Sequence, residues 1–195
     1  MGKRSPVKAL PTLFLDRDGT LIHEVNYLKD ARQVRLLPGV AQGLRRLKCA
    51  GFTLVVTSNQ SGIARGFITP AQLESVRARF FQLLAQRKAL VDGYYWCPHP
   101  PHGRCLCRKP RSGMLRQAAR ELKIPWRGGI SVGDKPSDVW LAQRAEGFGV
   151  LVLSGYGREF FKNWKGRKPD HTAKNFKAVV DWILAHVRKD GAWII

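Results

Sequence analysis

Acidic residues are scarce in this chain. Its 195 residues include 14 Asp and Glu against 34 Lys and Arg, which gives a formal net charge of +20 at pH 7. Such a balance is found in proteins that bind nucleic acids or other anions. The basic residues are dispersed, however, and neither a groove-reading motif nor a series of aromatics alternating with arginine is present. The composition therefore favours an anionic small-molecule partner, and a nucleic acid is the less favoured alternative.

Long apolar runs are also missing. No stretch reaches the roughly 18 apolar residues of a transmembrane helix, and no apolar signal-peptide core follows the basic residues near Met1. Repeats and low-complexity tracts are absent from the sequence as well. We therefore expect a cytoplasmic protein with no membrane partner. The length suits a single domain over 1–195, with a core at about 10–188.

Cysteines are few, and three of the four lie close together. In a reducing compartment such a cluster argues for a metal and against disulfides. Three thiolates and one imidazole match a closed structural zinc site. The predicted zinc ligands, all in loop 97–107, are Cys97, His99, Cys105 and Cys107. We expect His102 to be an exposed loop residue, and Cys49, alone on a predicted helix, to be a small core residue.

The most informative stretch is Asp16-Arg17-Asp18-Gly19-Thr20, which directly follows the apolar run 13–15. That run predicts a short buried strand. The chain must leave strand geometry at Arg17 to reach the Gly19 turn, so the carboxylates of Asp16 and Asp18 can converge on one point. One carboxylate could then attack phosphorus while the other handles the proton. Taken alone, the pentapeptide also suits a polar turn that closes a strand.

Apolar periodicity predicts alternating strands and helices. Strands are expected at 13–15, 52–57, 92–96, 129–132 and 150–153. Helices are expected at 40–50, from Pro70 with Thr69 as N-cap, at 113–122, at 137–145 and near the C-terminus from Phe176 to Val187. The basic stretch 158–168 is expected to be a loop. This alternation predicts an α/β fold with a doubly wound parallel sheet, whose ligands bind at the carboxyl ends of the strands.

Three further motifs follow in a fixed order, and they carry a family resemblance. They are Ser58 after an apolar run, Lys109, and Gly133-Asp134 with Asp138. The four motifs together resemble those of the haloacid dehalogenase superfamily. The closer resemblance is to the D-glycero-D-manno-heptose 1,7-bisphosphate phosphatases, carried by Asp16 to Thr20, Ser58 to Gly66, Cys97-Pro98-His99 and Cys105 to Pro110. It spans nearly the whole chain and implies a capless Rossmann-like domain with a zinc loop.

The resemblance implies a role for each motif. Asp16 would be the nucleophile that forms an aspartyl-phosphate, and Asp18 the general acid and base. Catalytic Mg²⁺ would be held by the carboxylates of Asp16 and Asp134 and by the Asp18 backbone carbonyl. Asp138 would act through a water molecule, or would only interact with a helix N-terminus. Ser58 and the Asn59 amide would bind phosphate oxygens, with Lys109 supplying positive charge.

Substrate recognition is expected from two loops. The residues implied by the resemblance are Glu24, Val25, Asn26, Tyr27, Ser58, Asn59, Gln60, Ser61, Arg108 and Lys109. Arg108 could reach a distal phosphate with its planar fork, or could be an ordinary surface arginine. Lys135 could face phosphate or pair with a neighbouring carboxylate.

The expected function is that of a Mg²⁺-dependent phosphatase that removes the C7 phosphate of heptose 1,7-bisphosphate. This step would lead toward the ADP- or GDP-heptose of bacterial surface glycans such as lipopolysaccharide. Histidinol-phosphate phosphatase is the first alternative and polynucleotide 3′-phosphatase the second; a non-enzymatic zinc-loop module is the last. The expected partner is a small-molecule sugar bisphosphate, and the expected state is a monomer.

Overall fold

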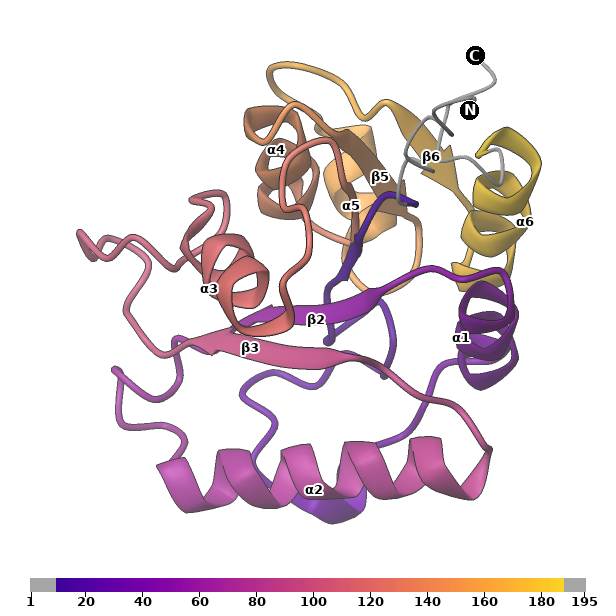
Figure 1. Cartoon of the computed structure of the whole chain (residues 1–195). Helices are drawn as coiled ribbons and strands as arrows, with labels where there is room; N and C mark the ends of the chain where they lie inside the picture. Colours follow the sequence, from indigo (N-terminus) through magenta and orange to yellow (C-terminus); the bar gives the residue numbers. More distant parts are fainter. Residues whose placement is uncertain (1–9, 188–195) are drawn as a thin grey trace, which may run out of the picture.

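The computed structural model describes residues 10–187. Its centre is a six-stranded, all-parallel sheet in the order β3-β2-β1-β4-β5-β6 (Figure 1). The strands are β1 (Leu13–Leu15), β2 (Leu54–Asn59), β3 (Gly93–Cys97), β4 (Ile130–Gly133), β5 (Phe148–Val152) and β6 (His171–Ala173). The predicted α/β fold with a parallel sheet is confirmed.

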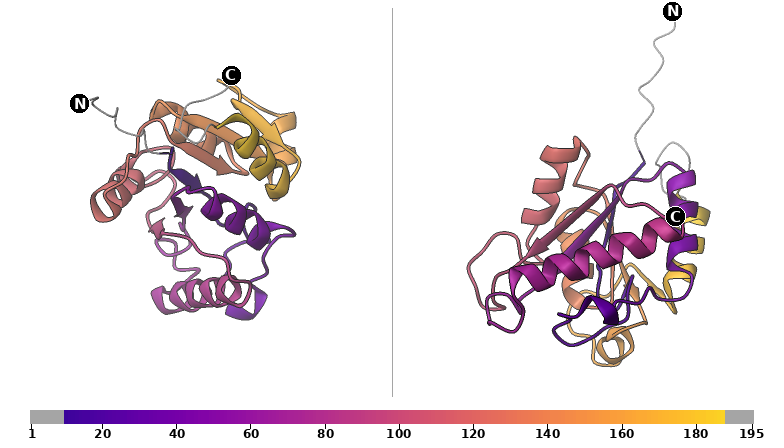
Figure 2. Two further views of the ribbon diagram at one scale, coloured as in Figure 1. Left: turned by 45° about the vertical axis from the view of Figure 1, so that its right-hand side comes forward. Right: turned by 90° about the horizontal axis from the view of Figure 1, so that it is seen from below.

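Helices cover both faces of the sheet, as the two views of Figure 2 show. They are α1 (Val40–Cys49), α2 (Pro70–Gln86), α3 (Gly113–Leu122), α4 (Pro136–Arg144), α5 (Gly157–Lys162) and α6 (Phe176–His186), with a short 3-10 helix η1 (Ala31–Gln33). Side chains alternate along β1, so that Leu13 and Leu15 join the core beneath α1, α2 and α6 while Phe14 joins the core beneath α3 and α4.

Local sequence explains where the helices begin. At α2, the Thr69 hydroxyl accepts a hydrogen bond from the Gln72 amide, and the Gln72 side chain accepts one from the Thr69 amide. Pro70 is the first helical residue, a position where the missing N–H costs nothing. This start was predicted. No helix within residues 10–187 is long and apolar enough to cross a membrane.

Strand β1, which directly precedes Asp16, lies in the middle of the sheet. Leu13 pairs with Leu54 on one side and with Ile130 on the other. Because all three strands are parallel, their carboxyl ends meet at one edge of the sheet. Asp16, Ser58 and Asp134 lie at these ends, and this register brings them together.

The structure differs from the predicted elements at three places. Part of the expected loop 158–168 forms helix α5, and β6 was not predicted. Its three residues are too few for a periodic signal. The prediction for Cys49 was wrong, because Cys49 is exposed. The buried face of α1 contains Val40, Leu44 and Leu47, and a residue two positions beyond Leu47 is turned about 200° away from that face.

Candidate active site

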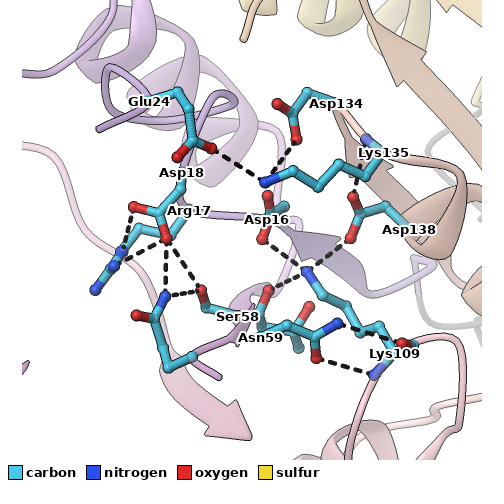
Figure 3. Close-up of polar contacts among 12 residues, drawn as sticks. Asp16, Arg17, Asp18, Glu24, Ser58, Asn59, Lys109, Asp134, Lys135 and Asp138 are labelled. Carbon is cyan, nitrogen blue, oxygen red and sulfur yellow. Dashed lines mark hydrogen bonds and ion pairs between the residues drawn. The ribbon is translucent and has the colours of Figure 1, made fainter. Parts of the chain in front are cut away.

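A buried lysine joins two carboxylates at the carboxyl edge of the sheet (Figure 3). The Lys109 Nζ atom lies 2.7 Å from Asp16 Oδ1 and 2.6 Å from Asp138 Oδ1. It also donates a hydrogen bond to the Thr57 carbonyl at 2.7 Å. Lys109 is only 4% exposed. Burial by itself would lower the pKa of Lys109, but Asp138 and Asp16 raise it above its usual value, so the group is an ammonium.

The side chain of Asn59 fixes the backbone that carries this lysine. Its Nδ2 donates to the Lys109 carbonyl at 3.2 Å, and its Oδ1 accepts from the Lys109 amide at 3.0 Å. Asn59 is the last residue of β2, whereas Lys109 follows the zinc loop. This pair of bonds therefore attaches the zinc loop to the central sheet. Asn59 had been predicted to bind phosphate through its backbone amide and to contribute to substrate recognition, but this side-chain contact was not predicted.

Three carboxylates form an anionic cluster beside the lysine. Oxygen atoms of Asp16, Asp134 and Asp138 all lie within 4.8 Å of one another. Asp134 Oδ2 accepts a hydrogen bond from the Tyr156 amide at 2.8 Å, but Asp134 Oδ1 is buried without a hydrogen-bond partner. Burial and the charge of Asp16 raise the pKa of Asp134 to about 8. A hard divalent cation would neutralise this cluster, so the residues fit Mg²⁺.

Gly19 allows the β1 turn to approach Asp134. Its φ angle is +78°, and a Cβ atom at this position would lie 2.2 Å from Asp134 Oδ2. Any other residue would push the two strand ends apart. The first motif therefore needs a glycine at position 19, because Asp134 of the last motif lies so close to it.

Asp138 makes the helix N-terminal contact that was considered for it, and it also pairs with Lys109. Its Oδ2 accepts from the Lys135 amide at 3.2 Å at the start of α4, while its Oδ1 contacts Lys109. Burial raises the pKa of Asp138 to about 6, although the adjacent Lys109 opposes the shift. The helix-terminus contact and membership of the carboxylate cluster thus occur together.

Asp18 is turned toward a buried arginine (Figure 3). Arg17 donates from Nε at 3.0 Å and from Nη2 at 2.8 Å to the two Asp18 oxygens, and its Nη1 donates to the Tyr94 hydroxyl at 2.9 Å. Gln60 Nε2 donates to Asp18 Oδ2 at 2.8 Å and to the Ser58 hydroxyl at 2.7 Å. Burial alone would raise the pKa of Asp18, but Arg17 holds it below its usual value. The structure therefore presents Asp18 as an ionised carboxylate.

The predicted catalytic side chains share one small cavity of about 30 Å³, close to the size that holds a water molecule. Its lining includes Asp16, Asp18, Ser58, Asn59, Lys109, Lys135 and Asp138. Asp16 and Asp18 do face a common space, as expected, although their carboxylates have different partners.

A larger cavity of about 250 Å³ contains most of the predicted substrate-binding residues. Its lining includes Glu24, Val25, Asn26, Tyr27, Asn59, Gln60, Ser61, Arg108 and Lys135. Lys135 Nζ pairs with Glu24 Oε2 at 3.0 Å, so the lysine both pairs with a carboxylate and faces the cavity. Burial, followed by the charges of Asp18 and Asp16, raises the pKa of Glu24 despite this contact.

The four predicted zinc ligands lie together at the end of β3. The Sγ–Sγ distances from Cys97 to Cys105 and to Cys107 are 3.7 and 3.2 Å, and His99 Nδ1 lies 3.5 Å from Cys97 Sγ and 3.2 Å from Cys107 Sγ. In a tetrahedral zinc site with Zn–S bonds of about 2.3 Å, sulfurs are about 3.8 Å apart. The donors therefore fit zinc with small adjustments. His102 is exposed and outside the cluster, as expected.

Sequence reasoning missed Arg17, Tyr94 and Tyr156. Arg17 was treated as a turn residue, yet it is 1% exposed. A long cation between two aspartates and directly after a buried strand was the available signal. Tyr94 contacts Arg17 from β3, and Tyr156 lines the larger cavity from the loop after β5. Tyr94 lies three residues before Cys97, but its contact is with Arg17, 77 residues earlier in the chain, so no local pattern could have identified it.

Comparisons with known proteins agree with this geometry. The HAD-hydrolase-like family model matches residues 106–179. A D-glycero-D-manno-heptose-1,7-bisphosphate 7-phosphatase of Thermosynechococcus vestitus is 36% identical over 190 residues, which cover 91% of this chain and 97% of that protein. The D-glycero-beta-D-manno-heptose-1,7-bisphosphate 7-phosphatase of Escherichia coli K12 is 42% identical over 76% of this chain and 82% of its own length.

A solved structure shares the fold closely. The D,D-heptose 1,7-bisphosphate phosphatase of B. bronchiseptica, crystallised with magnesium and phosphate, superposes with a TM-score of 0.81 at 34% identity. The match covers 89% of this chain and 98% of that one. The fold and the carboxylate–lysine site define a phosphatase of the haloacid dehalogenase superfamily. Within it, this chain belongs to the family of D-glycero-D-manno-heptose 1,7-bisphosphate 7-phosphatases.

Proposed function

We propose that this protein removes the C7 phosphate of D-glycero-D-manno-heptose 1,7-bisphosphate in a Mg²⁺-dependent reaction. The product, a heptose 1-phosphate, would be a precursor of the ADP- or GDP-heptose in bacterial surface glycans such as lipopolysaccharide. The observation that carries the proposal is the contact of Lys109 with both Asp16 and Asp138. Lys135 lines both the small cavity at these residues and the larger cavity that Arg108 lines. Family membership supports the choice of sugar.

In the proposed mechanism, Asp16 attacks phosphorus and forms an aspartyl-phosphate. Its Oδ1 is paired with Lys109, which leaves the other carboxylate oxygen for the attack. The Ser58 hydroxyl and the Asn59 amide, at the end of β2, receive phosphate oxygens. Lys109 keeps its charge throughout, because its ammonium stays in contact with Asp138 when Asp16 is consumed.

Asp18 would transfer the protons. It donates one to the leaving sugar oxygen and later accepts one from the water that hydrolyses the acyl-phosphate. In the structure Arg17 favours the ionised form, which is the form needed for the second step. A phosphate dianion bound beside Asp16 and Asp18, which both line the small cavity, would favour the protonated form of Asp18 by charge repulsion. Substrate binding would therefore prepare the acid.

Mg²⁺ would reduce the electrostatic repulsion between the substrate phosphate and the carboxylate cluster. The carboxylates of Asp16 and Asp134 and the Asp18 carbonyl would hold the ion, with Asp138 acting through water. The zinc loop would have a positional role. It supports Arg108, whose Nη1 donates to the His99 carbonyl at 3.4 Å.

Arg108 is our candidate for binding the phosphate that does not react. It lines the 250 Å³ cavity. The other cations of that lining are Lys135 and the buried Arg17. Binding energy from a remote group can orient the reacting one, so loss of this contact should lower kcat/KM. A charge-assisted hydrogen bond is worth about 1.5 to 3 kcal/mol, which corresponds to roughly ten- to a hundredfold.

The test is a steady-state comparison of substrates at fixed ionic strength. The panel contains both anomers of heptose 1,7-bisphosphate, heptose 7-phosphate, histidinol phosphate and a 3′-phosphorylated oligonucleotide. We expect one of the bisphosphates to have the highest kcat/KM, and Arg108→Ala to reduce that value more than the value for heptose 7-phosphate.

The matched control is Arg104→Ala, since Arg104 is an exposed arginine of the same loop that does not line the cavity. It should leave the substrate order and kcat/KM unchanged. Preference for histidinol phosphate or for the oligonucleotide would instead support one of the two alternative functions.

A further inference from the structure

Helix α5 and the turn after it form a surface that the phosphatase site does not use. We define this surface as residues 158–168. It carries five cations, Arg158, Lys162, Lys165, Arg167 and Lys168, against the single acid Glu159. Every one of the five is exposed. Two adjacent phenylalanines interrupt the charges: Phe160 is 37% exposed and Phe161 is 49% exposed.

The protein fold does not need these cations. Within the described residues, only Arg167 has a carboxylate partner, Asp170 at 3.4 Å, and this pair is largely exposed. The turn is held by other groups. Trp164 packs edge-to-face on Trp140 of α4, with ring centroids 6.2 Å apart, and Gln143 donates to the Lys168 carbonyl at 2.8 Å. The turn therefore has a defined shape while its charges remain available.

Helix α5 protrudes from the domain. Its only buried residue is Gly157, where a Cβ atom would lie 1.9 Å from the Val152 carbonyl oxygen. The five residues 158–162 that follow are all exposed, so side chains point outward all around the helix. The exposed helix forms a convex face, and none of the residues 158–168 lines either active-site cavity.

We propose that surface 158–168 binds the headgroup region of an anionic phospholipid bilayer. Exposed aromatics flanked by lysine and arginine are the composition of interfacial membrane segments, in which apolar rings enter the headgroup boundary and cations attract acidic lipids. Single-stranded nucleic acids are bound by basic grooves with aromatic platforms along them, and the convex α5 offers no groove. This proposal departs from the sequence-based expectation of no membrane partner.

Binding at this surface would place the active-site opening near the bilayer. Tyr156 immediately precedes α5 and lines the 250 Å³ cavity, where Lys135 Nζ lies 5.1 Å from its ring centroid. In the absence of a membrane, the cations of the same surface would attract anionic sugar phosphates toward the cavity. The proposal does not depend on the identity of the substrate.

The experiment is co-sedimentation of the full chain with vesicles of phosphatidylglycerol and phosphatidylcholine, compared with vesicles of phosphatidylcholine alone. We expect at least about tenfold stronger partition onto the anionic vesicles, and a steep loss with added salt. Lys162→Glu with Lys165→Glu should reduce partition on the order of tenfold or more. Phe160→Ser with Phe161→Ser should also reduce it, while turnover of a soluble phosphate ester stays unchanged.

The matched control is Lys88→Glu with Lys174→Glu. Both lysines are exposed, neither has a carboxylate partner in the described part of the chain, and the net charge changes by the same amount. This control variant should bind the anionic vesicles nearly as strongly as the wild type.

Three results would overturn the proposal. The first is an equal loss of vesicle binding in the control variant, which would indicate attraction by net charge alone. The others are tighter binding of single-stranded oligonucleotide than of anionic vesicles at equal phosphate concentration, and a dimer that is lost in the phenylalanine variant.

Discussion

At the scale of single residues, the ion pair between Arg17 and Asp18 fixes the orientation of the Asp18 carboxylate. The guanidinium is buried and its fork matches both carboxylate oxygens, with a further bond to the Tyr94 hydroxyl. A carboxylate held by two parallel bonds cannot rotate freely. We infer that Arg17 orients Asp18 for proton transfer and is a positioning residue.

Replacing Arg17 tests this orientation. Arg17→Lys keeps the charge but loses the planar fork, so kcat should fall by roughly ten- to a hundredfold while KM changes little. Arg17→Met should in addition lower the free energy of unfolding by about 3 kcal/mol or more, because a buried carboxylate loses its partner. Steady-state kinetics and urea denaturation are the measurements. Tyr94→Phe is the control: it retains the Arg17–Asp18 contact, so kcat should stay within about threefold of wild type.

The nucleophile gives a simpler prediction. Asp16→Asn removes the attacking charge and a metal ligand together, so turnover should fall by at least about a thousandfold while the fold is retained. Asp18→Asn should also be severely impaired, because it can no longer protonate the leaving group. Single-turnover assays with circular dichroism as a check on folding measure both effects. Near-normal turnover by Asp16→Asn would contradict the covalent mechanism.

At the scale of elements, three of the four motifs could be read from the sequence because each lies at the end of a strand, whereas Lys109 lies in the loop between β3 and α3. The limits of α3, 113–122, were predicted correctly, and the apolar runs gave β1 to β5 to within about two residues. The sequence also pointed to three thiols and an imidazole in one short loop, and the structure brings their ligand atoms within 4.8 Å of one another. In these cases the signal is local.

The remaining contacts depend on tertiary structure and had no local signal. The bonds of Asn59 to Lys109 join β2 to a loop 50 residues later. Tyr94 on β3 contacts Arg17, which follows β1, although β2 lies between these two strands in the sheet. Spacing along a chain does not determine such pairings.

The zinc loop can be tested as an element. The double variant Cys105→Ser, Cys107→Ser should lose stoichiometric zinc, and its thermal midpoint should fall because metal binding stabilises only the folded loop. Metal analysis and calorimetry measure these effects. Cys49→Ser is a matched control, since this cysteine is exposed and outside the cluster. It should retain zinc and stability. Full zinc content in the double variant would exclude the proposed ligands.

At the scale of the whole molecule, the buried acidic cluster links stability to pH. Burial and neighbouring charge raise the pKa of Asp134 from 3.8 to about 8 in the folded protein. Between these values the folded state holds a proton that the unfolded state has lost, so the contribution of this group to stability falls as pH rises. Asp138 acts in the same direction, whereas Asp18, with its lowered pKa, acts in the opposite one.

Mg²⁺ should reverse this loss, because its ligands must be deprotonated to bind it. We therefore expect saturating Mg²⁺ to raise the thermal midpoint more at about pH 8 than at about pH 5. Asp134→Asn should abolish most of that difference and make the metal-free protein less sensitive to pH in this range. Differential scanning calorimetry with and without Mg²⁺ measures both quantities. A Mg²⁺ effect that is independent of pH would place the ion elsewhere.

The central position of β1 also has a consequence for protein synthesis. Strand β1, which precedes Asp16, is synthesised before the other five strands of the sheet, and its second neighbour, β4, is not made until residues 130–133. Until then one edge of β1 is open, and the nascent chain lacks both Asp134 and Asp138. A nascent chain that ends before Ile130 therefore cannot form the carboxylate cluster. We expect activity only after β4 and α4 have been synthesised and have packed against the first half of the chain.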